Sequence, residues 1–192
     1  MNKEQMEEDI REAVKVLRAG GLILYPTDTV WGIGCDATNA EAVAKVYALK
    51  KRAESKSMLV LVDSADRASL YASGMTDTAY DMLTMSDKPL TLILDGAKNL
   101  AKNLIAEDGS IGIRVTTEEY SKELCFRFGK AIVSTSANVS GEPAAGVYSE
   151  ISEEIRSGVD YIAKCRRDET KKSQPSSIVR LREDGRVTVI RP

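Results

Sequence analysis

Short apolar segments alternate with amphipathic helical patterns along this chain, and this alternation limits the possible folds more than any other feature. Apolar runs such as Leu90 to Leu94 have the length of buried strands and are far too short to cross a bilayer. Between such runs, Met6, Ile10 and Leu17 recur at helical spacing. Because helices and strands alternate without strict regularity, we expect an α/β domain with a twisted, mixed β-sheet flanked by helices.

The same patterns predict the positions of the individual elements. We expect helices over residues 6–17, 38–50, 66–71, 76–85, 118–128 and 151–155, and strands over 22–25, 58–62, 90–94, 110–115, 131–134 and 161–165. Thr38 and Glu41 have the spacing of a helix capping box. Residues 177–181 and 187–190 pair as a hairpin, because Gly185 lies between them in a turn sequence.

Composition indicates one domain, spanning residues 1–192. A chain of 192 residues with 43% apolar content can bury one core but is short for two domains. Three cysteines, Cys35, Cys125 and Cys165, form neither a disulfide framework nor a zinc motif, so we expect reduced packing residues. The acidic, amphipathic start is unlike a signal peptide, and we expect a cytoplasmic protein without a membrane partner.

Histidine is absent from the sequence, and its absence restricts the possible chemistry. No imidazole is available as a general base near neutral pH, as a metal ligand, or as the partner of a serine or cysteine nucleophile. The net charge of −2 does not by itself predict a nucleic-acid partner. Any catalysis must therefore rely on carboxylates, hydroxyls, cations and backbone groups.

The segment Pro26 to Gly34 follows a predicted strand and combines hydroxyls, a carboxylate and two glycines. Its hydroxyls, on Thr27 and Thr29, are suited to a small polar ligand, whereas an ordinary strand-to-helix turn would have similar chemistry. We interpret Trp31 as a packing residue. Asp28 is interpreted as holding the loop through backbone N–H groups rather than as a proton-transfer residue.

A basic cluster at the end of the second predicted helix is the next candidate. Four cations, Lys50, Lys51, Arg52 and Lys56, fall within seven residues. Cations at a helix C-terminus offset the macrodipole, so a solvated helix end explains any one of them. Their concentration in a chain of net negative charge favours a phosphate-bearing partner.

A third candidate segment, residues 134–141, follows the strand predicted at 131–134 and combines four hydroxyls, an amide and a glycine. Backbone N–H groups and short hydroxyl side chains can surround an anion, although the sequence contains no Walker motif. A Ser/Thr/Asn-rich surface turn is the alternative. Arg114 and Arg191 add cations at strand ends, where each alone is typical of a surface charge.

Several segments match the motifs of one family in order along the chain. They are Pro26 to Gly34 for PTDTVYGLG, Lys50-Lys51-Arg52 for K-x-R, Pro89 to Leu94 for P-x-T-L-I-L, Ile113-Arg114-Val115 for V-R-V/M, Ser136 to Gly141 for SAN-x-SG, and Ser176 to Val179 for S-T-V-V. On these motifs the chain resembles the YrdC/Sua5 threonylcarbamoyl-adenylate synthases, in their short single-domain form. It departs from them at Trp31, where tyrosine is usual, and at Ala53 and Ser57, where prolines are usual.

The resemblance implies a YrdC-like fold with a positively charged concave pocket that holds ATP and L-threonine side by side. It implies catalytic roles for Lys50 and Arg52. The residues implied for ATP are Arg52, Lys56, Ser136, Ala137, Asn138, Ser140 and Arg191, and those implied for threonine are Thr27, Thr29, Thr91, Arg114, Thr135 and Ser177. No metal held by the protein is expected, because Mg²⁺ would arrive with ATP.

The activity implied by the resemblance joins L-threonine, bicarbonate or CO2, and ATP into threonylcarbamoyl-AMP and pyrophosphate. A downstream tRNA threonylcarbamoyl transferase complex would use the product for t6A modification of tRNA. Two alternatives remain at this point: a non-catalytic module that binds double-stranded RNA in ribosome maturation, and a paralogue active in another carbamoyl transfer. Direct contact with tRNA or double-stranded RNA is compatible with the basic residues.

Overall fold

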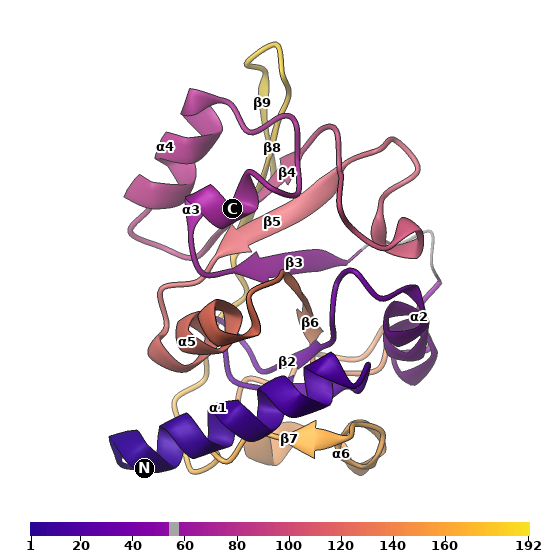
Figure 1. Cartoon of the computed structure of the whole chain (residues 1–192), viewed down its shortest axis with the longest axis vertical. Coiled ribbons are helices and arrows are strands. Elements are labelled where there is room, and N and C mark those ends of the chain that lie inside the picture. The colour runs from indigo at the N-terminus through magenta and orange to yellow at the C-terminus, as the bar shows by residue number, and fades with distance from the viewer. Residues whose placement is uncertain (54–57) are drawn as a thin grey trace.

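The computed structural model describes residues 1–53 and 58–192, and its strands form one sheet (Figure 1). The strands are β1 (Ile23–Tyr25), β2 (Gly32–Gly34), β3 (Leu59–Val62), β4 (Leu90–Leu94), β5 (Ile111–Val115), β6 (Ile132–Ser136), β7 (Tyr161–Ile162), β8 (Ser177–Leu181) and β9 (Val187–Arg191). Within the described residues they pair in the order β7-β1-β2-β6-β3-β5-β4-β8-β9. β7 with β1, β3 with β5, and β4 with β8 are parallel, and the other neighbours are antiparallel, so the sheet is mixed as predicted.

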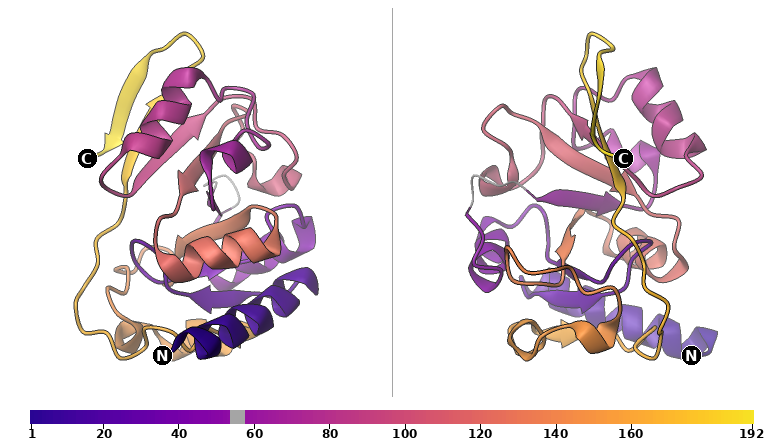
Figure 2. Two further views of the ribbon diagram at one scale, coloured as in Figure 1. Left: turned by 60° about the vertical axis from the view of Figure 1, so that its left-hand side comes forward. Right: turned by 180° about the vertical axis from the view of Figure 1, so that it is seen from behind.

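Helices cover one face of this sheet. The helices are α1 (Lys3–Arg18), α2 (Ala40–Leu49), α3 (Ala65–Ala68), α4 (Asp77–Met85), α5 (Glu119–Phe128) and α6 (Glu153–Ser157), with 3-10 turns η1 (Lys102–Leu104) and η2 (Tyr148–Glu150). In Figure 1, α1, α3, α4 and α5 lie in front of the strands, and α1 packs against α5. Seen from behind in the right-hand view of Figure 2, β3 and β5 face the viewer, and α1 lies at the bottom, farther from the viewer. Val60, Leu92 and Ile113 are fully buried and belong to the core.

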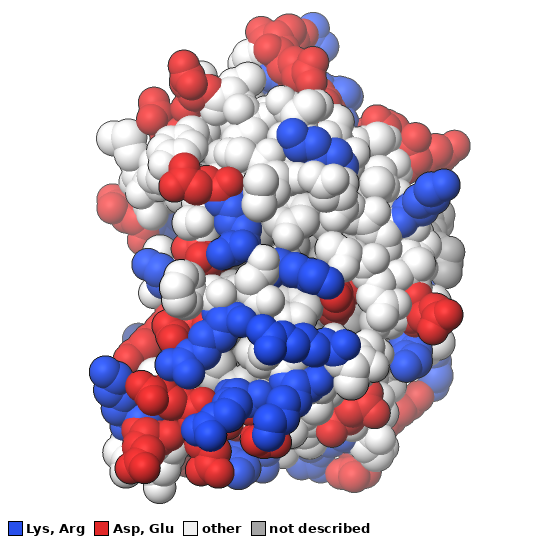
Figure 3. All heavy atoms as spheres, viewed as in Figure 1, with Lys and Arg blue, Asp and Glu red and all other residues white. Residues whose placement is uncertain are grey.

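The outer surface of the helix layer is charged. Figure 3 shows Lys and Arg side chains gathered across this face, interleaved with Asp and Glu. Many of these charges pair with each other: Arg127 contacts both Glu123 and Glu7, and Arg67 contacts Asp63. A paired, solvated charge layer of this kind contributes little to stability. No helix in residues 1–53 and 58–192 is long and apolar enough to span a membrane.

Local signals explain most of the element boundaries. Asn2 and Gln5 form a reciprocal capping box at the start of α1, and Gly129 adopts a φ of 79° where α5 ends. The capping prediction for α2 was wrong by one residue, because Asn39 accepts the first N–H groups while the Thr38 hydroxyl donates to Asp36. All three cysteines are free, as expected.

Two strand predictions differ from the structure. β2 was missed, because it lies inside the Pro26 to Gly34 segment and is completed by pairing with β1 and β6. The predicted strand over 161–165 is only the two-residue β7, since the backbone N–H groups of Lys164 and Cys165 donate to the buried Asp9 carboxylate instead of a neighbouring strand.

Candidate functional site

A cavity of about 620 Å³ lies on the sheet face opposite the buried side chains of Leu92 and Ile113. Strand register builds its floor, because residues directly opposite each other in a sheet share a face. Thr91 of β4 pairs with Arg114 of β5 and with Ile178 of β8, which in turn pairs with Arg191 of β9. The volume is within the range of small-molecule sites.

Gly112 leaves space at the centre of the cavity floor, because it has no side chain. It pairs with Leu59 on one side and Ile93 on the other, and all three line the cavity. A Cβ atom at this position would lie 3.2 Å from the Leu59 Cβ and 3.4 Å from the Thr91 Cγ2. Any larger residue would therefore press against both neighbouring strands and reduce the cavity.

The loop between β1 and β2 forms one wall and is held by its own hydroxyls. Thr27 Oγ1 donates to the Val30 carbonyl at 2.8 Å and accepts from the Thr29 backbone N–H at 3.1 Å. The two threonine hydroxyl oxygens lie 3.1 Å apart. Thr27 is almost fully buried and does not line the cavity, whereas Thr29 and Trp31 do. Thr27 thus positions Thr29.

Arg114 enters the cavity from β5 with one side of its guanidinium already occupied. Its Nε lies 3.1 Å from Asp28 Oδ1, and both side chains are nearly inaccessible. These atoms are in ion-pair contact without meeting hydrogen-bond geometry. Burial raises the pKa of Asp28, and this effect outweighs the opposing attraction of Arg114. Asp28 therefore orients Arg114, a role that the sequence interpretation did not include.

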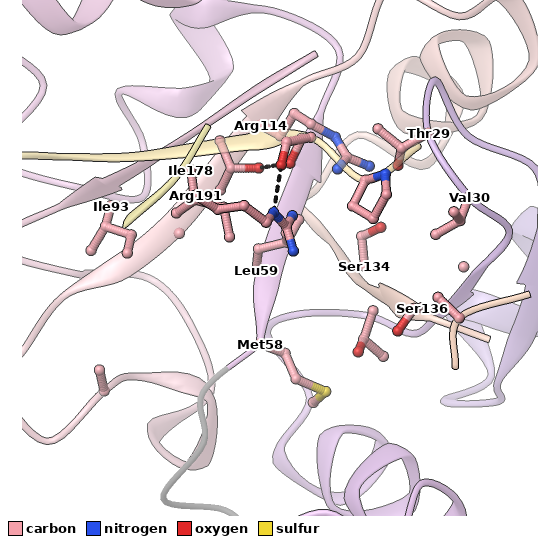
Figure 4. Close-up of a pocket in the computed structure, with 18 of the residues that line it drawn as sticks. Thr29, Val30, Met58, Leu59, Ile93, Arg114, Ser134, Ser136, Ile178 and Arg191 are labelled. Atoms are coloured by element: carbon pink, nitrogen blue, oxygen red, sulfur yellow. Dashed lines mark hydrogen bonds between the residues drawn. The ribbon is translucent and has the colours of Figure 1, made fainter. Parts of the chain in front are cut away.

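Arg191 is fixed at the end of β9 by the segment before β8. Its Nε donates to the Ser176 carbonyl at 2.8 Å, and the Ser176 and Thr91 hydroxyl oxygens lie 2.9 Å apart (Figure 4). Burial lowers the pKa of Arg191, and the nearby positive charge of Arg114 lowers it further. Two cations of the cavity are thus close enough to influence each other, an arrangement that favours an anionic ligand.

Lys50 lies beneath the loop that follows β6 and does not line the cavity. Its ammonium donates to the carbonyl oxygens of Ser136 and Asn138, and the Ser140 N–H donates back to the Lys50 carbonyl at 2.8 Å. Burial, with a smaller contribution from Arg52, lowers the pKa of Lys50 to about 8. Lys50 therefore holds the loop in place.

The structure brings together about half of the residues predicted for the site. The predicted residues that line the cavity are Thr29, Arg52, Thr91, Arg114, Thr135, Ser136 and Arg191. The predicted residues that do not line it are Thr27, Lys50, Ala137, Asn138, Ser140 and Ser177. Lys56 lies outside the described residues. Contact of the lining residues with a ligand stays a prediction.

Strand parity explains why Ser177 does not line the cavity. Side chains alternate across a strand, and Ile178 and Arg180 of β8 face the cavity together with Ser176. Ser177 therefore points to the opposite face.

Several lining residues were missed by the sequence interpretation. Ser134 lies in the candidate segment 134–141 and Ser176 in the segment matched to S-T-V-V, but neither was predicted to contact a ligand. Alternation of side chains along the strand would have identified Ser176. Glu107 and Asp108 meet Arg180 only in the fold: Arg180 ion-pairs with Asp108 at 2.8 Å, and all three residues line the cavity. No short-range sequence pattern links residues so far apart along the chain.

The described part of the chain offers no group of side chains that could hold a metal ion. Residues 1–53 and 58–192 contain no cluster of three or more His, Cys, Asp or Glu side chains suited to a metal ion. Asp28 and Asp108 are each held by an arginine. Mg²⁺ that arrives with a nucleotide stays a prediction.

The fold and cavity define a mixed α/β protein whose pocket offers arginines and hydroxyls to a polar, anionic ligand. The family model Sua5_yciO_yrdC, described as "Telomere recombination", matches residues 15–192. A protein of Pseudoalteromonas translucida named threonylcarbamoyl-AMP synthase is 32% identical, and the match covers 81% of this chain and 84% of that protein. One of Vibrio campbellii with the same name is 30% identical, with 89% and 93% covered. The chain belongs to the Sua5/YciO/YrdC family.

Solved structures share the fold. A variant of P. abyssi Sua5 superposes with a TM-score of 0.87 at 24% identity, covering 95% of this chain and 56% of Sua5. P. abyssi Sua5 complexed with L-threonine gives 0.80 at 22% identity, covering 90% and 50%. E. coli YciO also gives 0.80, at 24% identity, covering 95% and 87%. This chain thus spans about half the length of the Sua5 chains, and these likenesses establish the YrdC-like fold.

Proposed function

We propose that this protein is a threonylcarbamoyl-AMP synthase, a nucleotidyltransferase that forms threonylcarbamoyl-AMP and pyrophosphate from L-threonine, bicarbonate or CO2, and ATP for t6A modification of tRNA. The observation that carries the proposal is the similarity to relatives of that name along most of the chain. The cavity supports it, because Arg52, Arg114 and Arg191 line one space with the hydroxyl of Thr29.

In this proposal the substrates supply the reactive groups. The neutral amine of threonine combines with CO2 to give a carbamate and a proton, which bicarbonate or solvent accepts, and a carbamate oxygen then attacks the α-phosphorus of ATP as pyrophosphate leaves. The protein needs no imidazole base for this sequence of steps. Its contribution is to align the reactants and to stabilise negative charge on the phosphates.

Two sets of cavity residues divide this work, one for the threonine and one for the nucleotide. Arg114 and Thr29 are assigned to the threonine, whose carboxylate suits a guanidinium that lines the cavity and that Asp28 holds in place. Arg52, Ser136 and Arg191 are assigned to the nucleotide. Lys50 acts indirectly, by fixing the loop that carries Ser136, so its proposed catalytic role becomes one of positioning.

Partners and cofactor belong to the same proposal. Mg²⁺ would enter bound to ATP phosphates and neutralise part of their charge. A tRNA threonylcarbamoyl transferase complex would consume the labile adenylate, in the cytoplasm. Direct binding of tRNA or double-stranded RNA is the competing function if catalysis is absent.

Pyrophosphate release tests the proposal. The purified protein is incubated with ATP, Mg²⁺ and bicarbonate, and with L-threonine, L-serine or no amino acid. Release that requires both threonine and bicarbonate is the expected result. A folded protein that releases none under any of these conditions would refute the proposed activity and favour the RNA-binding function.

A further inference from the structure

Arg166 lies in the connection between β7 and β8 and has an unusual backbone conformation. Its φ is 59°, in the left-handed region that side chains other than glycine rarely adopt. A residue keeps such a conformation only when its surroundings enforce it, and these positions concentrate at functional sites. The contacts that enforce it here lead to the wall of the cavity.

The chain just before Arg166 is anchored to α1. Asp9, which is buried, accepts the backbone N–H groups of Lys164 at 2.8 Å and Cys165 at 3.1 Å. The Tyr161 hydroxyl donates to the same carboxylate at 2.5 Å. The backbone is thereby fixed one residue before Arg166, and the direction of its side chain is set.

The guanidinium of Arg166 joins three segments that are far apart in the sequence. Its Nη1 donates to the Thr27 carbonyl oxygen at 2.9 Å and lies 3.4 Å from Glu118 Oε1. Its Nε donates to Glu169 Oε1 at 2.7 Å. About a quarter of the side chain is exposed, at 24%. Two carboxylates therefore hold the guanidinium against the Thr27 peptide.

Thr27 transmits this contact to the cavity. Its hydroxyl meets the Thr29 hydroxyl and accepts from Arg114 Nη2 at 3.5 Å. The residue between the two threonines, Asp28, pairs with Arg114 Nε. Movement of the Thr27 peptide would therefore displace both residues assigned to the amino-acid substrate, Thr29 and Arg114.

We propose that Arg166 is a positioning residue that sets the affinity for the amino-acid substrate without affecting that for the nucleotide. This inference rests on the proposed function, since it concerns the residues of the same cavity that are assigned to the threonine. The residues assigned to the nucleotide are anchored separately: the loop of Ser136 is fixed by Lys50, and Arg191 by the Ser176 carbonyl.

Three substitutions at this position separate positioning from folding. Arg166→Gly removes the guanidinium and relieves the left-handed backbone, so the fold should be kept. Arg166→Gln removes the charge, and Arg166→Lys keeps the charge but cannot reach both Thr27 and Glu118 with one planar group. Arg186→Gln is the matched control, because Arg186 is an exposed arginine in the β8–β9 turn, paired only loosely with Asp184 at 3.3 Å.

The measurement is the KM for L-threonine and the KM for ATP in pyrophosphate release, together with the thermal midpoint of each variant. For Arg166→Gly and Arg166→Gln we expect the KM for threonine to rise about tenfold, because Thr29 and Arg114 are no longer held in position through the Thr27 peptide. The KM for ATP should stay within about twofold, because the hydrogen bonds that fix Ser136 and Arg191 do not involve the Thr27 peptide. Arg166→Lys should fall between, and Arg186→Gln should match the unaltered protein.

Threonine binding by calorimetry keeps the two proposals distinguishable. If the unaltered protein binds threonine and releases pyrophosphate but Arg166→Gly leaves the KM for threonine unchanged, this inference alone is overturned. An equal rise in both KM values, or unfolding of Arg166→Gly, would make Arg166 a structural anchor and overturn it as well. An unaltered protein that neither binds threonine nor releases pyrophosphate would overturn both proposals.

Discussion

Neighbouring serines before and at the start of β8 offer a direct test of which side chains belong to the cavity. Ser176 lines it and is buried with its hydroxyl 2.9 Å from that of Thr91. Ser177 lies on the opposite face by strand parity, although motif comparison assigns it to threonine. Ser176→Ala and Ser177→Ala remove the same hydroxyl from adjacent positions, so each is the control for the other.

The expected loss of stability in Ser176→Ala follows from the Thr91 hydroxyl, which the substitution leaves without its partner. Only 1% of Thr91 is exposed, so water cannot replace the lost partner of its hydroxyl. A buried hydroxyl left unpaired costs about 1–3 kcal/mol. Ser177 is half-buried, and its substitution should change the free energy of unfolding by less than about 0.5 kcal/mol.

Urea titration measures the difference in the free energy of unfolding, and the fluorescence of the single tryptophan reports ligand binding in the cavity. Trp31 lines the cavity, so its fluorescence should respond when ATP or threonine binds. Ser176→Ala should weaken binding, because the Ser176 hydroxyl holds the Thr91 hydroxyl on the cavity floor, whereas the Ser176 carbonyl that fixes Arg191 is kept. A larger loss of stability and of affinity in Ser177→Ala would refute the parity argument and restore the motif assignment.

Two further predictions concern a buried cation and the cavity floor. Since burial lowers the pKa of Lys50 to about 8 from 10.5, the folded chain releases a proton in this window that the unfolded chain keeps. The free energy of unfolding should therefore rise with pH between these values, by up to about 1.4 kcal/mol per pH unit. Denaturant titrations at several pH values measure this slope. Lys50→Met should remove it, and Lys51→Met, at the exposed neighbouring residue, should retain it. Gly112→Val should destabilise by about 1–3 kcal/mol through overpacking against Leu59 and Thr91 and should also block ligand binding in calorimetry, whereas unaltered affinity would contradict the floor assignment.

Sequence patterns predicted the elements whose signals are local. The helical spacing of Met6 to Leu17 lies inside α1, and the run Leu90 to Leu94 coincides with β4. β2 was missed because its three residues, with glycine at both ends, become a strand only through partners on β1 and β6. Pairing across the sheet carries this information, and no short window of sequence contains it.

The same difference between local sequence signals and long-range contacts applies to the candidate site. Resemblance selected segments that the fold brings to one cavity, because Thr29, Arg114, Ser136 and Arg191 all line it. It did not determine which side chains point inward, since that depends on strand parity and on packing beneath the loop. Arg166 illustrates the limit: its importance rests on a backbone angle and on contacts with segments far away in the sequence.

The cavity holds its polar groups in place before any ligand arrives, and this property agrees with the proposed chemistry. Arg114 is fixed by Asp28, Arg191 by the Ser176 carbonyl, and the hydroxyls of Thr91 and Ser176 contact each other. Groups already engaged in this way are poorly suited to attack a substrate or to shuttle protons. They are well suited to hold charged reactants in fixed positions, where preorganised charge stabilises a transition state without further rearrangement. A reaction whose nucleophile comes from threonine and CO2 requires the protein only to hold and align the reactants, and a protein without histidine can do this.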